Sequence, residues 1–111
     1  LETAVFGARP WTDYATFRPG PAMGAGRFFF AAVAAGGRVV VFGGLLDGTS
    51  SNTTELLDTQ TMAFTAGPNM LTARERCAAV QLDAERVLVV GGNSAAFLKT
   101  TEIFHLSTLT F

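Results

Sequence analysis

The chain has 111 residues, of which 49% are hydrophobic and 15% charged, and its formal net charge at pH 7 is -1. This length and composition fit a folded domain rather than a disordered segment, and the near-neutral charge gives no reason to expect nucleic acid or an acidic membrane surface as a partner. The single cysteine, Cys77, excludes a disulfide within the chain and a thiolate metal cluster, and no cofactor is predicted.

The apolar stretch Phe28–Leu46 carries the first strong strand signal. It is not predicted to span a membrane, because Arg38 at its middle costs about 2.5–3.5 kcal/mol in lipid and two Gly-Gly pairs interrupt it. Within it, "VVVF" (39–42) is a β-branched run bounded by glycine, which is typical of a strand buried on both faces. Gly36 and Gly37, just before it, supply the positive φ of a tight hairpin turn.

Two more strands complete a first unit, and a second unit follows. "TELLD" (54–58) predicts a third strand, and "MAFTA" (62–66) predicts a fourth that Pro68 ends, because proline cannot donate to a ladder. No segment shows sustained helical periodicity. In the second unit, strands are predicted in "RCAAVQL" (76–82), in "VLVV" (87–90), again buried on both faces, and in "TEIFH" (101–105).

The second unit repeats the first at a spacing of 47 or 48 residues. Arg27 and Arg74 lie 47 residues apart, and so do Phe64 and Phe111, whereas the Gly-Gly pairs at 43–44 and 91–92 lie 48 apart. A period of this length, built from four short antiparallel strands of about five residues, describes one blade of a propeller.

The order of these features resembles the kelch motif over essentially the whole chain: an apolar strand, Gly-Gly, a loop, Thr-Glu with an apolar pair, an aromatic residue, Gly-Pro-x-Met and then Arg. The resemblance implies an all-β fold of antiparallel four-stranded blades of a kelch-type β-propeller, incomplete in this chain. Phe17, Phe64 and Phe111 stand where kelch blades usually carry Trp, and Leu57 and Phe104 where they usually carry Tyr. The motif residues are Arg27, Gly43, Gly44, Glu55, Phe64, Met70, Arg74, Gly91, Gly92, Glu102 and Phe111.

The resemblance divides the chain into three parts. Residues 1–26 would hold the outer strands of a first blade, at Thr3–Phe6 and near Tyr14–Phe17; 27–73 a complete blade; and 74–111 a truncated next blade. Propellers close with four to eight blades, so we expect either a fragment of a larger propeller or a chain that takes the missing blades from other chains. Residues 3–17 and 101–111 are equivalent parts of a blade and would compete for one position in a ring of copies, which favours the fragment.

Charged residues recur once per repeat in apolar surroundings. Glu55 and Glu102 are therefore hypothesised to pair with Arg27 and Arg74, within or between blades, because buried charges are rarely left unpaired. The rings of the repeated aromatics at 64 and 111 are expected to bury apolar area between adjacent blades.

The resemblance implies that the loops that join blades, and the loops between the second and third strands, lie on one face that binds partners. Arg76 is a candidate to receive a partner's carboxylate in a bidentate pair, with an arginine solvated at the channel rim as the favoured interpretation. The "NTT" stretch at Asn52 fits a glycosylation acceptor, with a polar turn as the favoured interpretation. Candidate partner-binding residues are Phe28, Phe29, Asp47, Glu75, Arg76, Asn93 and Ser94.

Two classes of function are compatible with this sequence. The favoured class is a non-catalytic module that presents a propeller face to a protein partner. The alternative is a fragment of a copper-radical oxidase similar to galactose oxidase, whose kelch-type blades carry a "GPxMxxAR" stretch like "GPNMLTAR" (67–74) and whose catalytic residues would lie outside this chain. No nucleophile–base pair, carboxylate pair or metal-ligand set is evident in the sequence, and His105 is its only histidine.

Overall fold

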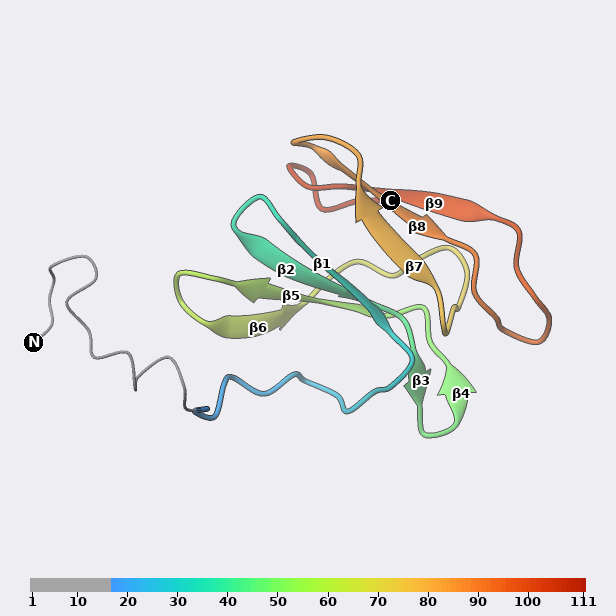
Figure 1. The fold of residues 1–111 in the computed structure, drawn as a ribbon, viewed down its shortest axis with the longest axis horizontal. Coiled ribbons are helices and arrows are strands. Elements are labelled where there is room, and N and C mark those ends of the chain that lie inside the picture. Colours follow the sequence, from blue (N-terminus) through green and yellow to red (C-terminus); the bar gives the residue numbers. More distant parts are fainter. Residues whose placement is uncertain (1–16) are drawn as a thin grey trace, which may run out of the picture.

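A computed structural model describes residues 17–111, so the strand predicted at Thr3–Phe6 and all but the last residue of the one near Tyr14–Phe17 lie outside the described range. Phe17 itself is fully exposed and belongs to no strand. The described residues form nine strands and no helix (Figure 1). The strands are β1 (Ala31–Ala35), β2 (Arg38–Phe42), β3 (Leu45–Leu46), β4 (Thr49–Ser50), β5 (Thr54–Asp58), β6 (Ala63–Ala66), β7 (Ala78–Gln81), β8 (Arg86–Val90) and β9 (Thr101–His105).

The first sheet has the order β1-β2-β5-β6, with every neighbouring pair antiparallel. Its register places Val40 opposite Val33 on one side and opposite Leu56 on the other. Gly36 and Gly37, with φ of 60° and 74°, form the two-residue turn between β1 and β2. The predicted four-stranded antiparallel sheet is therefore confirmed.

The second sheet has three strands, in the order β7-β8-β9. Its first turn replaces the glycines with Asp83, whose carboxylate accepts hydrogen bonds from the backbone N–H groups of Glu85 (2.9 Å) and Arg86 (2.8 Å). Hydrogen bonds, first that from the Arg86 side chain, lower the pKa of Asp83 to about 2. Where the first sheet has β6, the second has one isolated bridge between His105 and Thr110.

A short hairpin, β3–β4, projects from the first unit where the sequence analysis expected only a loop. Asp47 and Gly48 form its turn with φ of 49° and 79°. An Asp-Gly pair favours this kind of turn, because both of its central residues need positive φ. The Asp47-Gly48 dipeptide is therefore the sequence signal that could have predicted this hairpin.

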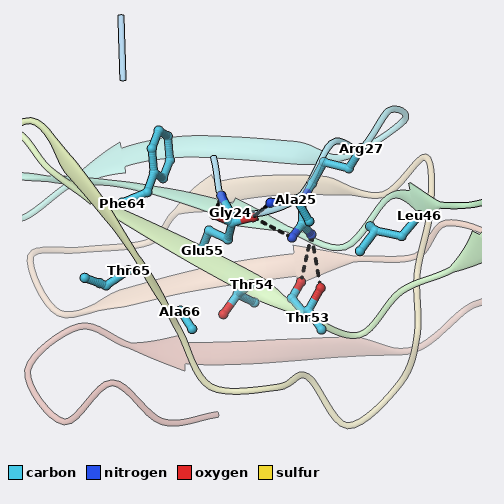
Figure 2. A pocket seen from close by; sticks show the side chains of 10 residues that line it. All are labelled: Gly24, Ala25, Arg27, Leu46, Thr53, Thr54, Glu55, Phe64, Thr65 and Ala66. Atoms are coloured by element: carbon cyan, nitrogen blue, oxygen red, sulfur yellow. Dashed lines mark hydrogen bonds and ion pairs between the residues drawn. The ribbon is translucent and has the colours of Figure 1, made fainter. Parts of the chain in front are cut away.

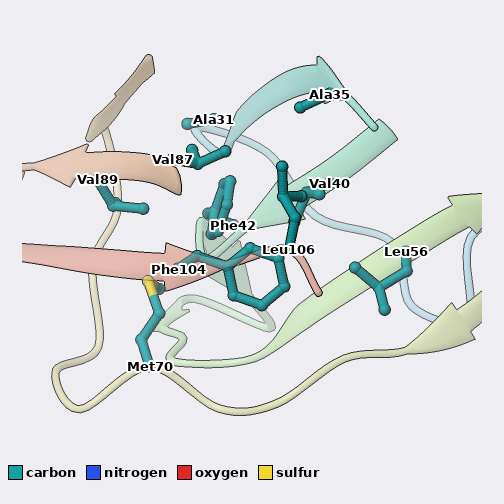
Figure 3. Close-up of a cluster of buried hydrophobic side chains, with 10 residues drawn as sticks. All are labelled: Ala31, Ala35, Val40, Phe42, Leu56, Met70, Val87, Val89, Phe104 and Leu106. Atoms are coloured by element: carbon teal, nitrogen blue, oxygen red, sulfur yellow. The ribbon is translucent and has the colours of Figure 1, made fainter. Parts of the chain in front are cut away.

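The two sheets stack face to face, and the hydrophobic core lies between them (Figure 3). Phe42 of β2 packs edge-to-face against Phe104 of β9, with ring centroids 5.9 Å apart, and lies 6.1 Å from Phe111. Since side chains alternate along a strand, each sheet has two distinct faces. The forward face of the first sheet (Val33, Val40, Phe42, Leu56) packs on the rear face of the second sheet (Val87, Val89, Phe104, Phe111).

The other two faces have no neighbouring sheet within residues 17–111, although Val41 and Glu55 on the rear face of the first sheet are buried. On the forward face of the second sheet, Val90 is 38% exposed and Val80 51% exposed, so the prediction that "VLVV" is buried on both faces is wrong. Its forward side lacks a neighbouring sheet in the described part of the chain. On the rear face of the first sheet, Leu57 and Phe64 are only half-buried, whereas the equivalent Phe104 is completely buried.

Candidate functional site

A buried ion pair in the second unit fixes the segment that leads from one sheet to the next. Arg74 is 0% exposed and donates to the carbonyl oxygens of Gly91 and Thr100, both at 2.9 Å, and to Glu102 Oε2 at 3.1 Å. The Glu102 carboxylate also accepts from the backbone N–H groups of residues 71 and 72, at 2.7 and 3.0 Å. We call this arrangement the Arg–Glu clamp; it ties the connecting segment to the ends of β8 and β9.

The first unit contains the same clamp (Figure 2). Arg27 Nη2 lies 2.9 Å from Glu55 Oε2, and Arg27 Nη1 donates to the Gly43 carbonyl at 2.8 Å. Gly24 and Ala25 donate their backbone N–H groups to the Glu55 carboxylate at 2.6 and 3.1 Å. The hypothesised Glu–Arg pairing is thus present in both repeats, and each arginine pairs with the glutamate of its own repeat.

The clamp also sets the protonation of Glu55. Burial by itself would raise the pKa of this carboxyl group, but hydrogen bonds from the Gly24 N–H, the Arg27 guanidinium and the Ala25 N–H outweigh it. The net effect holds the pKa of Glu55 below its ordinary value. The charged form is therefore the one that the fold stabilises.

The Gly-Gly pair is required where the two units meet. Gly43 has a φ of 64°, and a Cβ at this position would collide with the carbonyl oxygen of Arg74. Gly44 donates its N–H to that same carbonyl at 2.8 Å. The glycines therefore allow the backbone of the second unit to approach the end of β2 closely.

Three of the predicted partner-binding residues form one cluster at the loop ends next to this junction. Arg76 donates its backbone N–H to the Phe29 carbonyl at 2.6 Å, and its guanidinium carbon lies 4.1 Å from the centroid of the Phe29 ring. Phe28 packs on Phe29 with ring centroids 4.8 Å apart. The Arg76 side chain is 58% exposed, so its guanidinium is stacked on one face and open to solvent elsewhere.

The same bend in both repeats presents these residues. Phe29 and Arg76 occupy equivalent positions and have φ of 59° and 54°, values that cost energy for any residue with a Cβ. The scaffold imposes one backbone conformation, and the two repeats place different side chains on it.

The structure places the other predicted candidates less uniformly. Glu75 is buried, exchanges backbone hydrogen bonds with Asn93 at 2.8 and 2.9 Å, and accepts from Ser50 Oγ at 2.8 Å. Its Oε1 atom lies 3.8 Å from Arg76 Nε. Ser94 is half-buried in the loop after Asn93, and Asp47 is exposed in the β3–β4 turn.

Sequence reasoning missed Phe97, which is 94% exposed in the same loop as Asn93 and forms a bridge with it. A large aromatic residue in the loop "NSAAFLKT" was the available signal, because exposing an aromatic ring to water is unfavourable without a partner. We call the surface formed by Phe28, Phe29, Arg76 and Phe97 the loop-end face.

A cleft of about 270 Å³ opens on the first unit beside the clamp of Arg27 and Glu55 (Figure 2). Leu46, Phe64 and Ala66 contribute apolar surface to its wall. Phe64, Ala66 and Glu55 belong to the rear face of the first sheet, so the cleft is part of the uncovered face and not of the loop-end face.

Within residues 17–111, no group of three or more His, Cys, Asp or Glu side chains comes together in a way that would hold a metal ion. No helix of this part of the chain is long and apolar enough to cross a membrane. Burial raises the pKa of the half-buried Cys77 thiol, which opposes formation of a reactive thiolate.

Antiparallel sheets whose strands follow one another in chain order, and which stack on repeat-equivalent copies, define the blades of a β-propeller. Residues 26–71 match the family model described as the Kelch motif. This segment includes the whole first sheet, and the fold of residues 17–111 is that of antiparallel blades of a kelch-type β-propeller, incomplete in this part of the chain. A search of curated proteins found no match to the chain.

Proposed function

We propose that this kelch-type segment is a non-catalytic protein-interaction module and that its loop-end face contacts the partner. One observation carries the proposal: Arg76 lies 4.1 Å over the ring of Phe29, at a junction where the two repeats share a backbone but differ in side chains. The fold of the repeat does not require Phe29 or Arg76 at this position, so we attribute the choice of these two side chains to partner binding.

The composition of the loop-end face supports this function. Aromatic residues and arginine are enriched at the centres of protein interfaces, where they supply most of the binding free energy. Phe28 and Phe97 leave 54% and 94% of their surface in water, and the net charge of the chain gives no long-range attraction to nucleic acid.

The role we assign to Arg76 is to receive a partner's carboxylate. Stacking on Phe29 holds the guanidinium plane in place, which reduces the side-chain entropy lost on binding. Asn93, Ser94 and Asp47 would add hydrogen bonds at the edge of the interface. Glu75 helps to position Arg76, because its carboxylate lies beside the Arg76 guanidinium.

The test is a selection of peptides from a random phage-displayed library against the immobilised chain. We expect selected peptides to carry Asp or Glu and to lose at least tenfold in affinity for Arg76→Ala and for Phe29→Ala. Arg86→Ala is the matched control, because Arg86 is an exposed arginine at the opposite end of the sheet. Selected peptides that bind both variants as tightly as the parent chain, or a selection without any binder, would contradict the proposal.

A further inference from the structure

A hollow of about 300 Å³ opens on the first unit, at the end of the sheet opposite to the β3–β4 hairpin (Figure 1). The β1–β2 turn, the end of β5 and the turn after β5 form it, and we call it the turn-end hollow. Its lining residues are Gly36, Gly37, Arg38, Asp58, Thr59 and Gln60. We propose that the turn-end hollow binds a small organic acid with a hydrogen-bond donor on the carbon next to its carboxylate, as in α-hydroxy acids and α-amino acids.

The hollow contains a half-buried guanidinium group that has no carboxylate partner in the described part of the chain. Arg38 of β2 forms no ion pair with a carboxylate of residues 17–111. It makes one long hydrogen bond, of 3.5 Å, from Nη1 to the Leu106 carbonyl of the second unit. A guanidinium has five N–H donors, so most of those of Arg38 are available to a ligand. The second unit is present beside the hollow, since a Cβ at Gly36 would lie 3.7 Å from the Leu106 side chain.

The hollow also contains an acceptor. Asp58 is the direct cross-strand neighbour of Arg38, and side chains of such a pair lie on one face of a sheet. Its Oδ1 accepts from the backbone N–H groups of Gln60 (2.8 Å) and Thr61 (3.1 Å), and its Oδ2 accepts no hydrogen bond from residues 17–111. The hydrogen bonds from Thr61 and Gln60, and the charge of Arg38, hold the pKa of Asp58 below its ordinary value. Asp58 is therefore an ionised acceptor at neutral pH.

The equivalent arginine of the second unit already holds a carboxylate. Arg86 lies 48 residues after Arg38, and its Nε donates to Asp83 Oδ2 at 2.8 Å. Its Nη2 lies 2.7 Å from the same oxygen. Asp83 belongs to the β7–β8 turn, whereas the β1–β2 turn consists of Gly36 and Gly37 alone. The first unit thus keeps the arginine and lacks the carboxylate that its equivalent binds.

A second carboxylate lies at the same turn of the second unit. The Leu106 N–H donates to the Glu85 carbonyl at 2.8 Å, just as the Thr59 N–H donates to the Gly37 carbonyl at 3.2 Å, so Glu85 and Gly37 are equivalent. The Glu85 carboxylate accepts from the N–H group (2.9 Å) and the hydroxyl group (2.7 Å) of Ser107. Glycine has no side chain that could reach this position. We infer that the second unit supplies its own carboxylates where the first unit receives one from a ligand.

The two charges of the hollow select the ligand. The Arg38 guanidinium favours a carboxylate, which it can bind through two parallel hydrogen bonds. The negative charge of Asp58 opposes a plain carboxylate and favours one with a donor beside it, because a hydroxyl or ammonium group on the next carbon can donate to Asp58 Oδ2. This site is separate from the loop-end face, and the proposal does not depend on partner binding there.

The experiment titrates the isotope-labelled chain at neutral pH and constant ionic strength with glycolate, glycine and acetate, and follows the amide resonances by NMR. Acetate is the matched probe, because it has the carboxylate without the neighbouring donor. We expect saturable shifts of the Gly36, Gly37 and Gln60 amides, with glycolate or glycine binding about tenfold more tightly than acetate. Tighter binding of glycolate would identify the ligand as a hydroxy acid, and tighter binding of glycine as an amino acid.

Three variants assign the roles. Arg38→Gln should weaken binding of every acid by about tenfold or more, because it removes the partner of the carboxylate. Arg86→Gln is the matched control and should bind as the parent chain does, since Arg86 already holds Asp83. Asp58→Asn keeps a side-chain oxygen for the N–H groups of the turn but loses the charge, so it should remove the preference for glycolate or glycine while acetate binds at least as tightly as before.

Three results would each overturn the proposal. The first is the lack of a saturable shift at residues 36, 37 and 60 with all three acids. The second is binding to Arg38→Gln as tight as binding to the parent chain. The third is acetate binding to the parent chain as tightly as glycolate and glycine, because the donor next to the carboxylate would then play no part.

Discussion

Val39 in the first sheet and Val87 in the second are the same residue type at equivalent positions, 48 residues apart, yet only Val87 is completely buried. The reverse holds on the opposite faces, where Val40 is completely buried and its equivalent Leu88 is half-exposed. The repeat therefore determines which way these side chains point. At these positions the neighbouring sheet decides whether they are buried, whereas Val41 on the rear face of the first sheet is 3% exposed without one. The following predictions test this difference, beginning with the largest expected effect.

Arg74→Leu should lower the free energy of unfolding by about 3–5 kcal/mol, because it leaves the buried Glu102 carboxylate without its cationic partner. Urea denaturation followed by far-UV circular dichroism measures the change. Arg86→Leu, which breaks only the exposed pair with Asp83, serves as the control and should cost much less. If Arg74→Leu unfolds at the same urea concentration as the parent chain, the Arg–Glu clamp does not stabilise the fold.

Gly43→Ala and Gly91→Ala compare the same repeat position at a covered and an uncovered junction. Both glycines have positive φ, 64° and 62°, so each substitution should cost about 1–2 kcal/mol in backbone strain. Only at Gly43 does the Arg74 carbonyl occupy the space of the new Cβ; at Gly91 the nearest atom is the Leu98 carbonyl oxygen at 3.3 Å. Urea denaturation should therefore show the larger loss for Gly43→Ala, and equal losses would mean that the two units do not meet as described.

Val87→Ala and Val39→Ala compare burial directly. Removing two carbons from the completely buried Val87 should cost about 2 kcal/mol, from lost transfer free energy and a cavity between the sheets. The same change at the half-exposed Val39 should cost less than about 1 kcal/mol. The measurement is urea denaturation followed by far-UV circular dichroism; a larger loss at Val39 would reverse the assignment of the covered face.

Acid should weaken the fold through Glu55. Since the folded state holds the pKa of this carboxyl group below its ordinary value of 4.5, the charged form contributes stability above that pH, and this contribution is lost as the pH falls through the folded-state pKa. Urea midpoints measured from neutral pH downward should show a smaller acid-induced decrease in Glu55→Gln than in the parent chain. The same decrease in both proteins would show that Glu55 does not titrate as described.

Much of this architecture was readable in the sequence because the repeat places the same chemistry at the same intervals. Arg27 and Glu55 recur as Arg74 and Glu102 in apolar surroundings, and that is enough to predict their pairing. The exposure of Val90 was not predictable, since a strand's own residues do not indicate whether another sheet covers it. The stacking of Arg76 on Phe29 was also not predictable, because it depends on a contact across the junction that brings two repeat-equivalent bends together.

The stacking of the two sheets is the central claim, and nuclear Overhauser effects between aromatic rings test it most directly. With phenylalanine labelled selectively, the ring protons of Phe42 should show cross-peaks to those of Phe104 and Phe111, whose centroids lie 5.9 and 6.1 Å away. If Phe42 shows no cross-peak to either ring while the strand pairings within each sheet are observed, the sheets form without stacking and the account is contradicted.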